Sequence, residues 1–408
     1  MTRHTPLVLD PTGATAHQED RALRAMGPAA PVDLLGVRAW AVTDPALLRK
    51  LLTSPAVSKD ARAHWPEFEQ RAATWPLALW IAVRNMFTAY GADHRRLRRM
   101  VAPAFSSRRI DELRPAVEAM VTELIDDLAT VPAGQAVDLR ERLAYPLPIA
   151  VIGHLMGVPR DQRAGFRQLV DGVFDTTLTP EESQANAVRL YGVLDELIAT
   201  KTADPGDDMT SLLIAARDEE SDGTGFTGEE LRDTLLLMIS AGYETTVNVI
   251  DQAIVAMLTA PDQLDLVRAG KAGWYDVVEE TLRHEPAVKH LPLRYAVTDI
   301  ELPGGRTIAR GDAILASYAA ANRHPDWHGD SADAFDVTRT VKDHLAFGHG
   351  VHFCLGAPLA RLEVAEALRQ LFDRFPGLSL AVPAGELRPV ASLISNGHQE
   401  LPVLLTPA

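Results

Sequence analysis

The chain has 408 residues, of which 47% are hydrophobic, enough for a large core that could enclose a cofactor. It contains 40 Lys and Arg against 55 Asp and Glu, and the resulting net charge of −15 argues against nucleic acid or an anionic membrane as the main partner. Its single cysteine excludes an internal disulfide framework and suits a reducing cytoplasm.

The N-terminal segment, residues 1–20, has neither the apolar core of a signal peptide nor a membrane anchor, and we expect it to be peripheral to the fold. The apolar stretches 76–83 and 144–156 are short or interrupted by Pro and His. Neither stretch therefore predicts a membrane-spanning helix. We expect a soluble, cytoplasmic protein.

Residues 32–42 predict a small hairpin, and residues 45–52 predict a helix behind it. Helical periodicity then dominates as far as His284. The predicted helices are 93–104, 109–128, 138–156, 160–174, 180–202, 227–259, 261–269 and 275–284. The longest begins with a capping box, Thr227 to Glu230, and is apolar on all sides from Leu235 to Ala241, so its middle should be buried.

After Pro286 the pattern changes to period two, and residues 291–302 and 306–319 predict β-hairpins. Further strand-like segments lie at 378–382 and 401–405. No linker or repeat divides the chain. We therefore predict one domain over residues 1–408, mainly α with a smaller β part.

Residues 347–356 read FGHGVHFCLG and contain Cys354 together with three glycines. A helical pattern, residues 357–372, begins directly afterwards. Backbone N–H groups and the helix dipole at such a position favour a thiolate. An anionic sulfur of this kind is suited to be an axial ligand of haem iron.

Two alternatives apply to Cys354. A lone cysteine is usually a small buried hydrophobe. A zinc site is the second, because His344, His349 and His352 lie close to Cys354 in the sequence. Zinc motifs normally have paired cysteines or two histidines on one helix face, and neither is present. Glycines near the sulfur allow the backbone to approach a large flat group, so haem is preferred.

The central helix contains the sequence AGYETT, residues 241–246, after a run of apolar residues. Glu244 must be paired, protonated or next to water, because burial of an unpaired carboxylate costs several kcal/mol. A packing glycine at Gly242 and an ordinary salt-bridged glutamate would be the structural alternative. After an apolar run, the acid and the alcohol of Thr245 favour a proton relay into a dry pocket.

Several other charged residues suggest a function only when they are considered as a group. Glu280 and Arg283 are three residues apart and can share a helix face. His94, Arg98 and Arg294 come from distant parts of the chain. Cations of this kind would be needed to neutralise the two carboxylates of a buried haem.

These features, in this order, resemble the cytochrome P-450 family, specifically its soluble bacterial members. The resemblance extends from Val32 to Leu405. It is based on FGHGVHFCLG at 347–356, AGYETT at 241–246, the Glu280–Arg283 pair, and ANRHPDWH…FDVTR at 321–339. The resemblance implies the cytochrome P-450 fold, with the long central helix over a buried haem b.

The resemblance also implies roles for individual residues. Cys354 would be the proximal iron ligand, with Phe347 packed beside its loop. The backbone at Gly348 and Gly356, and Ala241 on the central helix, would lie against the porphyrin. The propionate-binding residues would be His94, Arg98, Arg294 and His352.

Glu280 and Arg283 would form a structural network with either Arg323 or Arg339. Glu244 and Thr245 would deliver the protons needed to cleave the O–O bond of dioxygen. Many relatives have histidine where this chain has Tyr243, but that position is variable.

The intact Glu244–Thr245 pair argues against the peroxide-using branch of the family, so electrons are expected from a ferredoxin and its reductase. A basic cluster could bind the ferredoxin, or could be a solvated helix face with internal salt bridges. The cluster consists of Arg95, Arg96, Arg99, Arg108 and Arg109.

The expected reaction is hydroxylation of an apolar polycyclic or macrocyclic molecule, steroid-like or macrolide-like, with molecular oxygen. A haem-binding sensor or ligand carrier without turnover is the alternative, and Glu244–Thr245 argues against it. The side chains expected to line the substrate pocket are Met86, Phe174, Met238, Ala241, Val288, Leu291, Leu293 and Ile394.

Overall fold

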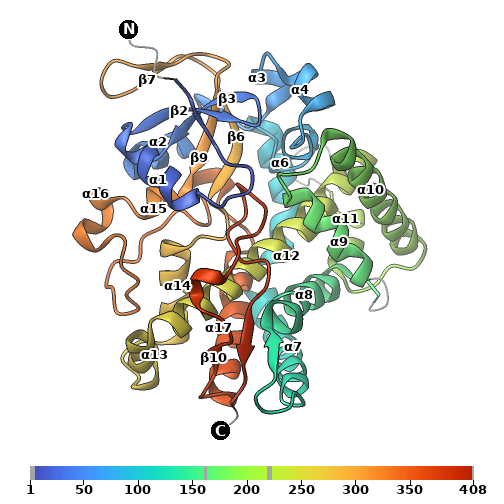
Figure 1. Ribbon diagram of the computed structural model, residues 1–408. Helices are drawn as coiled ribbons and strands as arrows, with labels where there is room; N and C mark the ends of the chain where they lie inside the picture. The colour runs from blue at the N-terminus through green and yellow to red at the C-terminus, as the bar shows by residue number, and fades with distance from the viewer. Residues whose placement is uncertain (1–4, 160–162, 218–222, 407–408) are drawn as a thin grey trace.

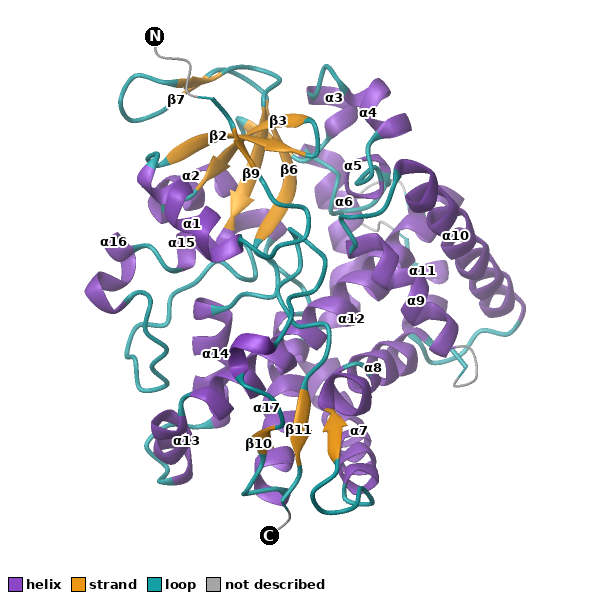
Figure 2. Cartoon of the chain, viewed as in Figure 1, coloured by secondary structure: helices purple, strands orange, loops and turns teal. Residues whose placement is uncertain are grey.

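The computed structural model describes residues 5–159, 163–217 and 223–406. Its architecture is mainly helical with a smaller β part, as predicted (Figure 1, Figure 2). The helices are α1 (Ala16–Ala25), α2 (Pro45–Thr53), α3 (Ala61–His64), α4 (Phe68–Thr74), α5 (Leu79–Ala82), α6 (Gly91–Val101), α7 (Ser107–Leu128), α8 (Pro146–Met156), α9 (Arg163–Phe174), α10 (Pro180–Ala203), α11 (Met209–Ala215), α12 (Gly228–Thr259), α13 (Pro261–Arg268), α14 (Trp274–His284), α15 (Tyr318–Asn322), α16 (Pro325–His328) and α17 (Ala357–Arg374).

The strands form one larger sheet and two small ones. Their bounds are β1 (Leu7–Val8), β2 (Ala29–Leu34), β3 (Val37–Val42), β4 (Val57–Ser58), β5 (Ala136–Asp138), β6 (His290–Ala296), β7 (Ile300–Glu301), β8 (Thr307–Ile308), β9 (Ala313–Ser317), β10 (Ser379–Leu380) and β11 (Pro402–Leu404). The larger sheet has the order β1-β2-β3-β9-β6-β4, and the small sheets are β10-β11-β5 and β7-β8. The predicted hairpin at 32–42 is confirmed as β2–β3, and β3 pairs in parallel with β9.

Helix α12 is the centre of the molecule (Figure 1). It begins with the predicted capping box, in which the Thr227 side chain accepts from the Glu230 amide and Glu230 accepts from the Thr227 amide. It packs against α8, α9 and α10 and also against α14 and α17. Its middle is largely buried, as predicted, and Tyr243, Glu244 and Thr246 of the AGYETT sequence are among the buried residues.

Two predictions about the fold are wrong. Residues 138–156 are not one helix: β5 is followed by a π-helical turn, Arg140–Ala144, and then by α8. Pro146 lacks an N–H and starts α8, because it cannot continue a hydrogen-bonded helix. The described part of the N-terminal segment, residues 5–20, is also not peripheral, because β1 pairs with β2 and Leu9 is buried; residues 1–4 lie outside the described residues.

No helix within the described residues is both long and apolar enough to span a bilayer.

Candidate functional site

The loop that contains Cys354 is held in a tight conformation directly before α17. The Cys354 amide donates a 2.9 Å hydrogen bond to the carbonyl of Phe347. Gly348 and Gly350 have φ of +72° and +73°, a region in which residues with a side chain are strained. A Cβ at Gly350 would also lie 2.9 Å from the Leu52 carbonyl oxygen. These glycines therefore set the path of the loop.

The Cys354 side chain faces a mostly apolar cavity deep in the molecule, and α12 forms the opposite wall. The lining includes Ala241, Gly242 and Thr245 from α12 and Phe347 from the cysteine loop. Burial raises the pKa of the Cys354 thiol, although the amides of Gly356 and Ala357 and the charge of Arg98 act in the opposite direction. The position before α17 alone therefore does not ionise this sulfur. A bonded metal ion would supply the positive charge that stabilises the thiolate.

The zinc alternative is not supported. His344 accepts from the Ala346 amide through Nδ1 and lies 3.3 Å from Glu279 through Nε2. Among the described residues, Cys354 belongs to no group of three potential metal ligands that lie close enough to share an ion.

Buried cations without counter-charges gather near the cysteine loop. Arg294 is 4% exposed and its Nε has no hydrogen-bond partner, while Arg98 donates to the Phe353 carbonyl at 2.7 Å. His94 is buried, its Nε2 is unpartnered, and its ring lies 4.2 Å from the ring of His352. Burial lowers the pKa of His94 to about 4 and also lowers the pKa of His352.

Lys59 belongs to this group, and our sequence analysis missed it. Its side chain is 2% exposed, and its Nζ lies 3.5 Å from the centre of the Phe87 ring and 3.3 Å from the Pro292 carbonyl. Burial and the neighbouring Arg294 lower the pKa of Lys59 well below its ordinary value. Because a buried cation without an anion is costly, these side chains fit a ligand that carries carboxylates.

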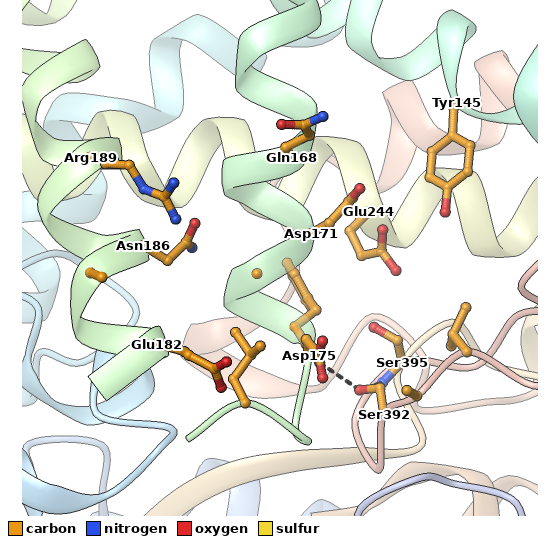
Figure 3. A pocket seen from close by; sticks show the side chains of 16 residues that line it. Tyr145, Gln168, Asp171, Asp175, Glu182, Asn186, Arg189, Glu244, Ser392 and Ser395 are labelled. Atoms are coloured by element: carbon orange, nitrogen blue, oxygen red, sulfur yellow. Dashed lines mark hydrogen bonds between the residues drawn. The ribbon is translucent and has the colours of Figure 1, made fainter. Parts of the chain in front are cut away.

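Glu244 and Thr245 are adjacent in α12 but face different spaces. Thr245 lines the cavity of Cys354, and its hydroxyl donates a 2.6 Å hydrogen bond to the Ala241 carbonyl. Glu244 lines a second, polar cavity between α9, α10 and α12 (Figure 3). The acid and the alcohol are therefore on the two sides of one helical wall.

A buried polar network holds Glu244 in place. Asn248 donates to Glu244 at 2.9 Å and accepts from Arg140 at 2.9 Å. Arg140 is fully buried and lies 3.3 Å from the carboxylate of Asp251, which also contacts His398 at 3.0 Å. Burial raises the pKa of Glu244, with Arg140 and Asn248 opposing the increase. Sequence reasoning missed Arg140, whose immediate neighbours in the chain give no sign of burial.

Comparisons with known proteins agree with this site. The Cytochrome P450 family model matches residues 190–269 and 275–381. The chain is 41% identical to 2-hydroxy-5-methyl-1-naphthoate 7-hydroxylase of Streptomyces carzinostaticus, with 98% of this chain and 97% of that protein covered. The chain belongs to the cytochrome P450 family. Its named relatives are monooxygenases and hydroxylases, and this protein is a P450 monooxygenase.

Solved structures of P450 enzymes have the same fold. CYP154A1 from Streptomyces coelicolor A3(2) superposes with a TM-score of 0.94 at 74% identity, covering 98% of this chain and 100% of that one. Testosterone-bound CYP154C4 from Streptomyces sp. ATCC 11861 gives a TM-score of 0.94 at 40% identity, covering 99% of each chain. The family implies a haem cofactor, and the cavity-facing sulfur, together with the basic side chains buried near the cysteine loop, fits it.

The predicted structural network of this P450 is present. Glu280 and Arg283 are fully buried and joined by two hydrogen bonds of 2.8 Å. The third member is Arg339, whose Nε lies 3.4 Å from Glu280. Arg323 instead contacts Glu285 and Asp333. The network also fixes the loop after α16, because Arg283 donates to the carbonyls of Ala332 and Ala334.

Only some of the side chains predicted to line the substrate pocket face the cavity of Cys354. The predicted side chains that line the cavity are Met86, Met238, Ala241, Val288 and Leu291. Leu293 and Ile394 are packed in the core outside this lining, and Phe174 lines the second cavity. A register shift in β6 between Leu291 and Arg294 explains why Leu293 does not line the cavity. The shift breaks the alternation that would place Leu291 and Leu293 on one face of the strand.

The basic cluster is not a set of five equivalent charges. Arg96 forms an ion pair with Glu230 at the start of α12, and Arg108 lies 3.7 Å from Glu112. Arg95, Arg99 and Arg108 are exposed. Arg96 therefore serves the packing of α6 on α12, and the exposed members remain candidates for binding a partner.

Proposed function

We propose that this P450 hydroxylates an unactivated C–H bond of a rigid, apolar polycyclic molecule, with haem b held by Cys354. The observation that carries the proposal is the position of the Cys354 sulfur. It faces an apolar cavity across from Thr245 and lies beside a cluster of unpaired buried cations. Bound haem supplies the activation of dioxygen and the electron transfer that side chains cannot perform.

The remaining residues would bind the haem propionates, hold the substrate and exclude water. Lys59, Arg98 and Arg294 would hold the two propionates, together with His94 and His352. The described lining from Met86, Met238 and Leu291 excludes water and holds the substrate mainly by shape. Thr245 presents its hydroxyl to the cavity, and Glu244 behind it can exchange protons with the polar cavity.

The substrate class rests on the lining and on the relatives. The cavity side chains are mostly apolar, which favours a ligand with few polar anchors. A naphthoate hydroxylase and a testosterone-bound enzyme are both about 40% identical to this chain over nearly its whole length. Both names describe rigid fused rings, which supports a polycyclic substrate; a macrolide-like ring is the second choice.

Electrons should come from a small acidic ferredoxin. Arg95, Arg99 and Arg108 are exposed on α6 and the start of α7, and Arg98 from the same helix reaches the carbonyl of Phe353 in the cysteine loop. A ferredoxin bound there would approach the sulfur side of the haem, and its association would weaken at high salt.

The test begins with a ligand panel of 2-hydroxy-5-methyl-1-naphthoate, testosterone and a macrolactone. Binding is scored by the low- to high-spin shift of the holoenzyme, and product is measured with NADPH, a surrogate reductase and a ferredoxin. We expect a fused-ring compound to give the largest shift and an oxygenated product.

Cys354→Ser is the matched control for the iron ligand. It should keep the fold but lose the red-shifted Soret band of the reduced CO complex, together with turnover. Persistence of that band would contradict the ligand assignment. Binding without product for every panel member would favour a ligand carrier instead.

A further inference from the structure

The second cavity has a volume of about 580 Å³ and is lined largely by polar side chains (Figure 3). It lies between α9, α10, α12 and the loop 390–395. Its charged and polar members are Tyr145, Gln168, Asp171, Asp175, Glu182, Asn186, Arg189, Glu244, Ser392 and Ser395. Four of these are carboxylic acids, and Glu244 is the one that belongs to the helix facing the cysteine.

Asp171 on α9 is the acid whose environment differs from the others. Its Oδ1 is buried and has no hydrogen-bond partner, and its Oδ2 lies 3.7 Å from Arg167 Nε. In Figure 3, the Asp171 and Glu244 side chains come from two helices and lie side by side at the same end of the cavity. A carboxyl oxygen left without a donor in such a place needs a proton, water or a neighbouring acid.

The nearby cations are shared with other carboxylates. Arg167 binds both oxygens of Glu141, at 2.7 and 2.5 Å. Arg140 lies 3.3 Å from Asp251. Two acids therefore share little positive charge, and a like-charge pair of this kind keeps a proton on one member.

The direction of the pKa shift agrees with that arrangement. Burial and the charge of Glu244 raise the pKa of Asp171 to about 7, with Arg167 and Arg140 opposing the increase. Two tyrosines also face Asp171: Tyr243 from α12, whose hydroxyl opposes the increase as well, and Tyr145. Asp171 can therefore gain and lose a proton at neutral pH, which a proton-transfer group must do.

We infer that Asp171 is the entry carboxyl of the proton supply, taking protons from water in the polar cavity and passing them to Glu244. In each transfer an O–H bond of Asp171 breaks as one forms on Glu244, and a cavity water then restores the proton on Asp171. A hydroxylation consumes two protons with its two electrons, so the step must recur within one turnover. The inference rests on the proposed function and adds a residue that acts through Glu244.

The experiment compares Asp171→Asn with Asp175→Asn in the holoenzyme. Asp175 belongs to the same cavity, but its carboxylate already accepts from the Thr177 amide at 2.8 Å and hydroxyl at 2.6 Å. The measured quantity is the amount of product formed per NADPH consumed, between pH 6 and pH 9, with the panel compound that gives the largest spin shift. We expect Asp171→Asn to lower this ratio roughly tenfold at neutral pH and to flatten its decline above pH 7.

Asp175→Asn should keep the parent ratio and pH profile, whereas Glu244→Gln should resemble Asp171→Asn. A second readout needs no turnover: infrared spectra of the resting holoenzyme should show the C=O band of a protonated acid that titrates near pH 7 in the parent. The band should be missing from Asp171→Asn and retained in Asp175→Asn.

Equal behaviour of the two Asn variants, in coupling or in the infrared band, would overturn the role of Asp171 while leaving the proposed function intact. If the parent oxidises no panel compound, the proposed function fails and the inference fails with it. A normal CO-complex spectrum of Asp171→Asn verifies that its haem site is formed.

Discussion

Lys59 is buried against the ring of Phe87 and next to Arg294, and no carboxylate contributes to its electrostatic environment. The protein's own residues thus leave an excess of buried basic groups at this site. The same holds for Arg294, whose Nε is unpartnered. Two propionates would balance these cations, so the residues whose burial is costly would be the same ones that bind haem.

Lys59→Met should therefore have opposite effects on the two states. The apoprotein should resist urea better, because a buried uncompensated charge is removed. The holoenzyme should lose haem to apomyoglobin about tenfold faster, because one charge-assisted hydrogen bond to a propionate is lost. Lys50→Met, at an exposed position of α2, is the control and should change neither quantity. An unchanged rate of haem transfer in Lys59→Met would exclude Lys59 from the propionate site.

Among the helices and strands, the features that depend on residues close in sequence were predicted correctly. The capping box of α12, the β2–β3 hairpin and the start of α17 directly after the cysteine loop were all predicted from residues close in sequence. The pairing of β3 with β9 joins Ala39 to Ala313, and no periodicity in one strand specifies a partner so distant. The division of residues 138–156 was missed although Pro146, which starts α8, is a local signal. The contact of Arg140 with Asn248 of α12 is the part that no local pattern specifies.

The residues of the candidate site also fall into those with a local sequence signature and those that depend on contacts between distant parts of the chain. The cysteine loop and the Thr245 position carry a local sequence signature, so they could be predicted. Lys59, Arg140 and Asp171 carry none, because their significance arises from burial beside groups on other elements. The resemblance to a family supplied the candidate propionate residues, and the structure was needed to add Lys59 as a further candidate and to choose Arg339 over Arg323.

The packing of the C-terminal loop on α12 can be tested at Gly397. A Cβ there would lie 2.2 Å from Asn248 Oδ1 and 2.8 Å from Arg140 Nη1, so Gly397→Ala must displace the buried network that holds Glu244. We expect a loss of about 3 kcal/mol in the free energy of unfolding, measured in urea, because a buried ion pair is disturbed. Gly385→Ala adds its methyl to open space and should change stability by less than about 0.5 kcal/mol. Equal urea midpoints for Gly397→Ala and the parent would show that the loop moves to accommodate the methyl group without a loss of stability.

For the whole molecule, α12 separates two environments that the reaction needs to keep apart. One is the mostly apolar cavity of Cys354 and the other is the polar cavity of Glu244 and Asp171. On the far side of the cysteine loop, Glu280, Arg283 and Arg339 form a buried network that holds α14 to the loop after α16. The proposed proton supply lies behind α12, whereas the proposed ferredoxin site on α6 is on the side of the cysteine loop, where Arg98 contacts Phe353.

Glu279 joins α14 to α17 and, through α17, to the cysteine loop. Its carboxylate lies 2.5 Å from Arg361 Nε and 3.3 Å from His344 Nε2, and Arg361 stacks on Phe347 at 4.6 Å. Burial alone would raise the pKa of Glu279, but hydrogen bonds from His344 and Arg361 outweigh it and lower the pKa from 4.5 to about 2. The folded state thus favours the carboxylate, and this stabilisation is complete above pH 4.5 and is lost as the pH falls towards 2.

Glu279→Gln should lower the free energy of unfolding by about 2–3 kcal/mol at pH 7. The difference from the parent should shrink between pH 4.5 and pH 2, because the unfolded parent then takes up a proton at this carboxyl while the folded parent keeps it ionised until the pH approaches 2. Urea midpoints of the holoenzyme at pH 7 and pH 3, with loss of the Soret band as the signal, measure both effects. Glu386→Gln, at an exposed position, provides the comparison and should follow the parent at both pH values. A deficit for Glu279→Gln that is as large at pH 3 as at pH 7 would mean that packing, and not the ionised pair with Arg361, holds the cysteine loop to the helices behind it.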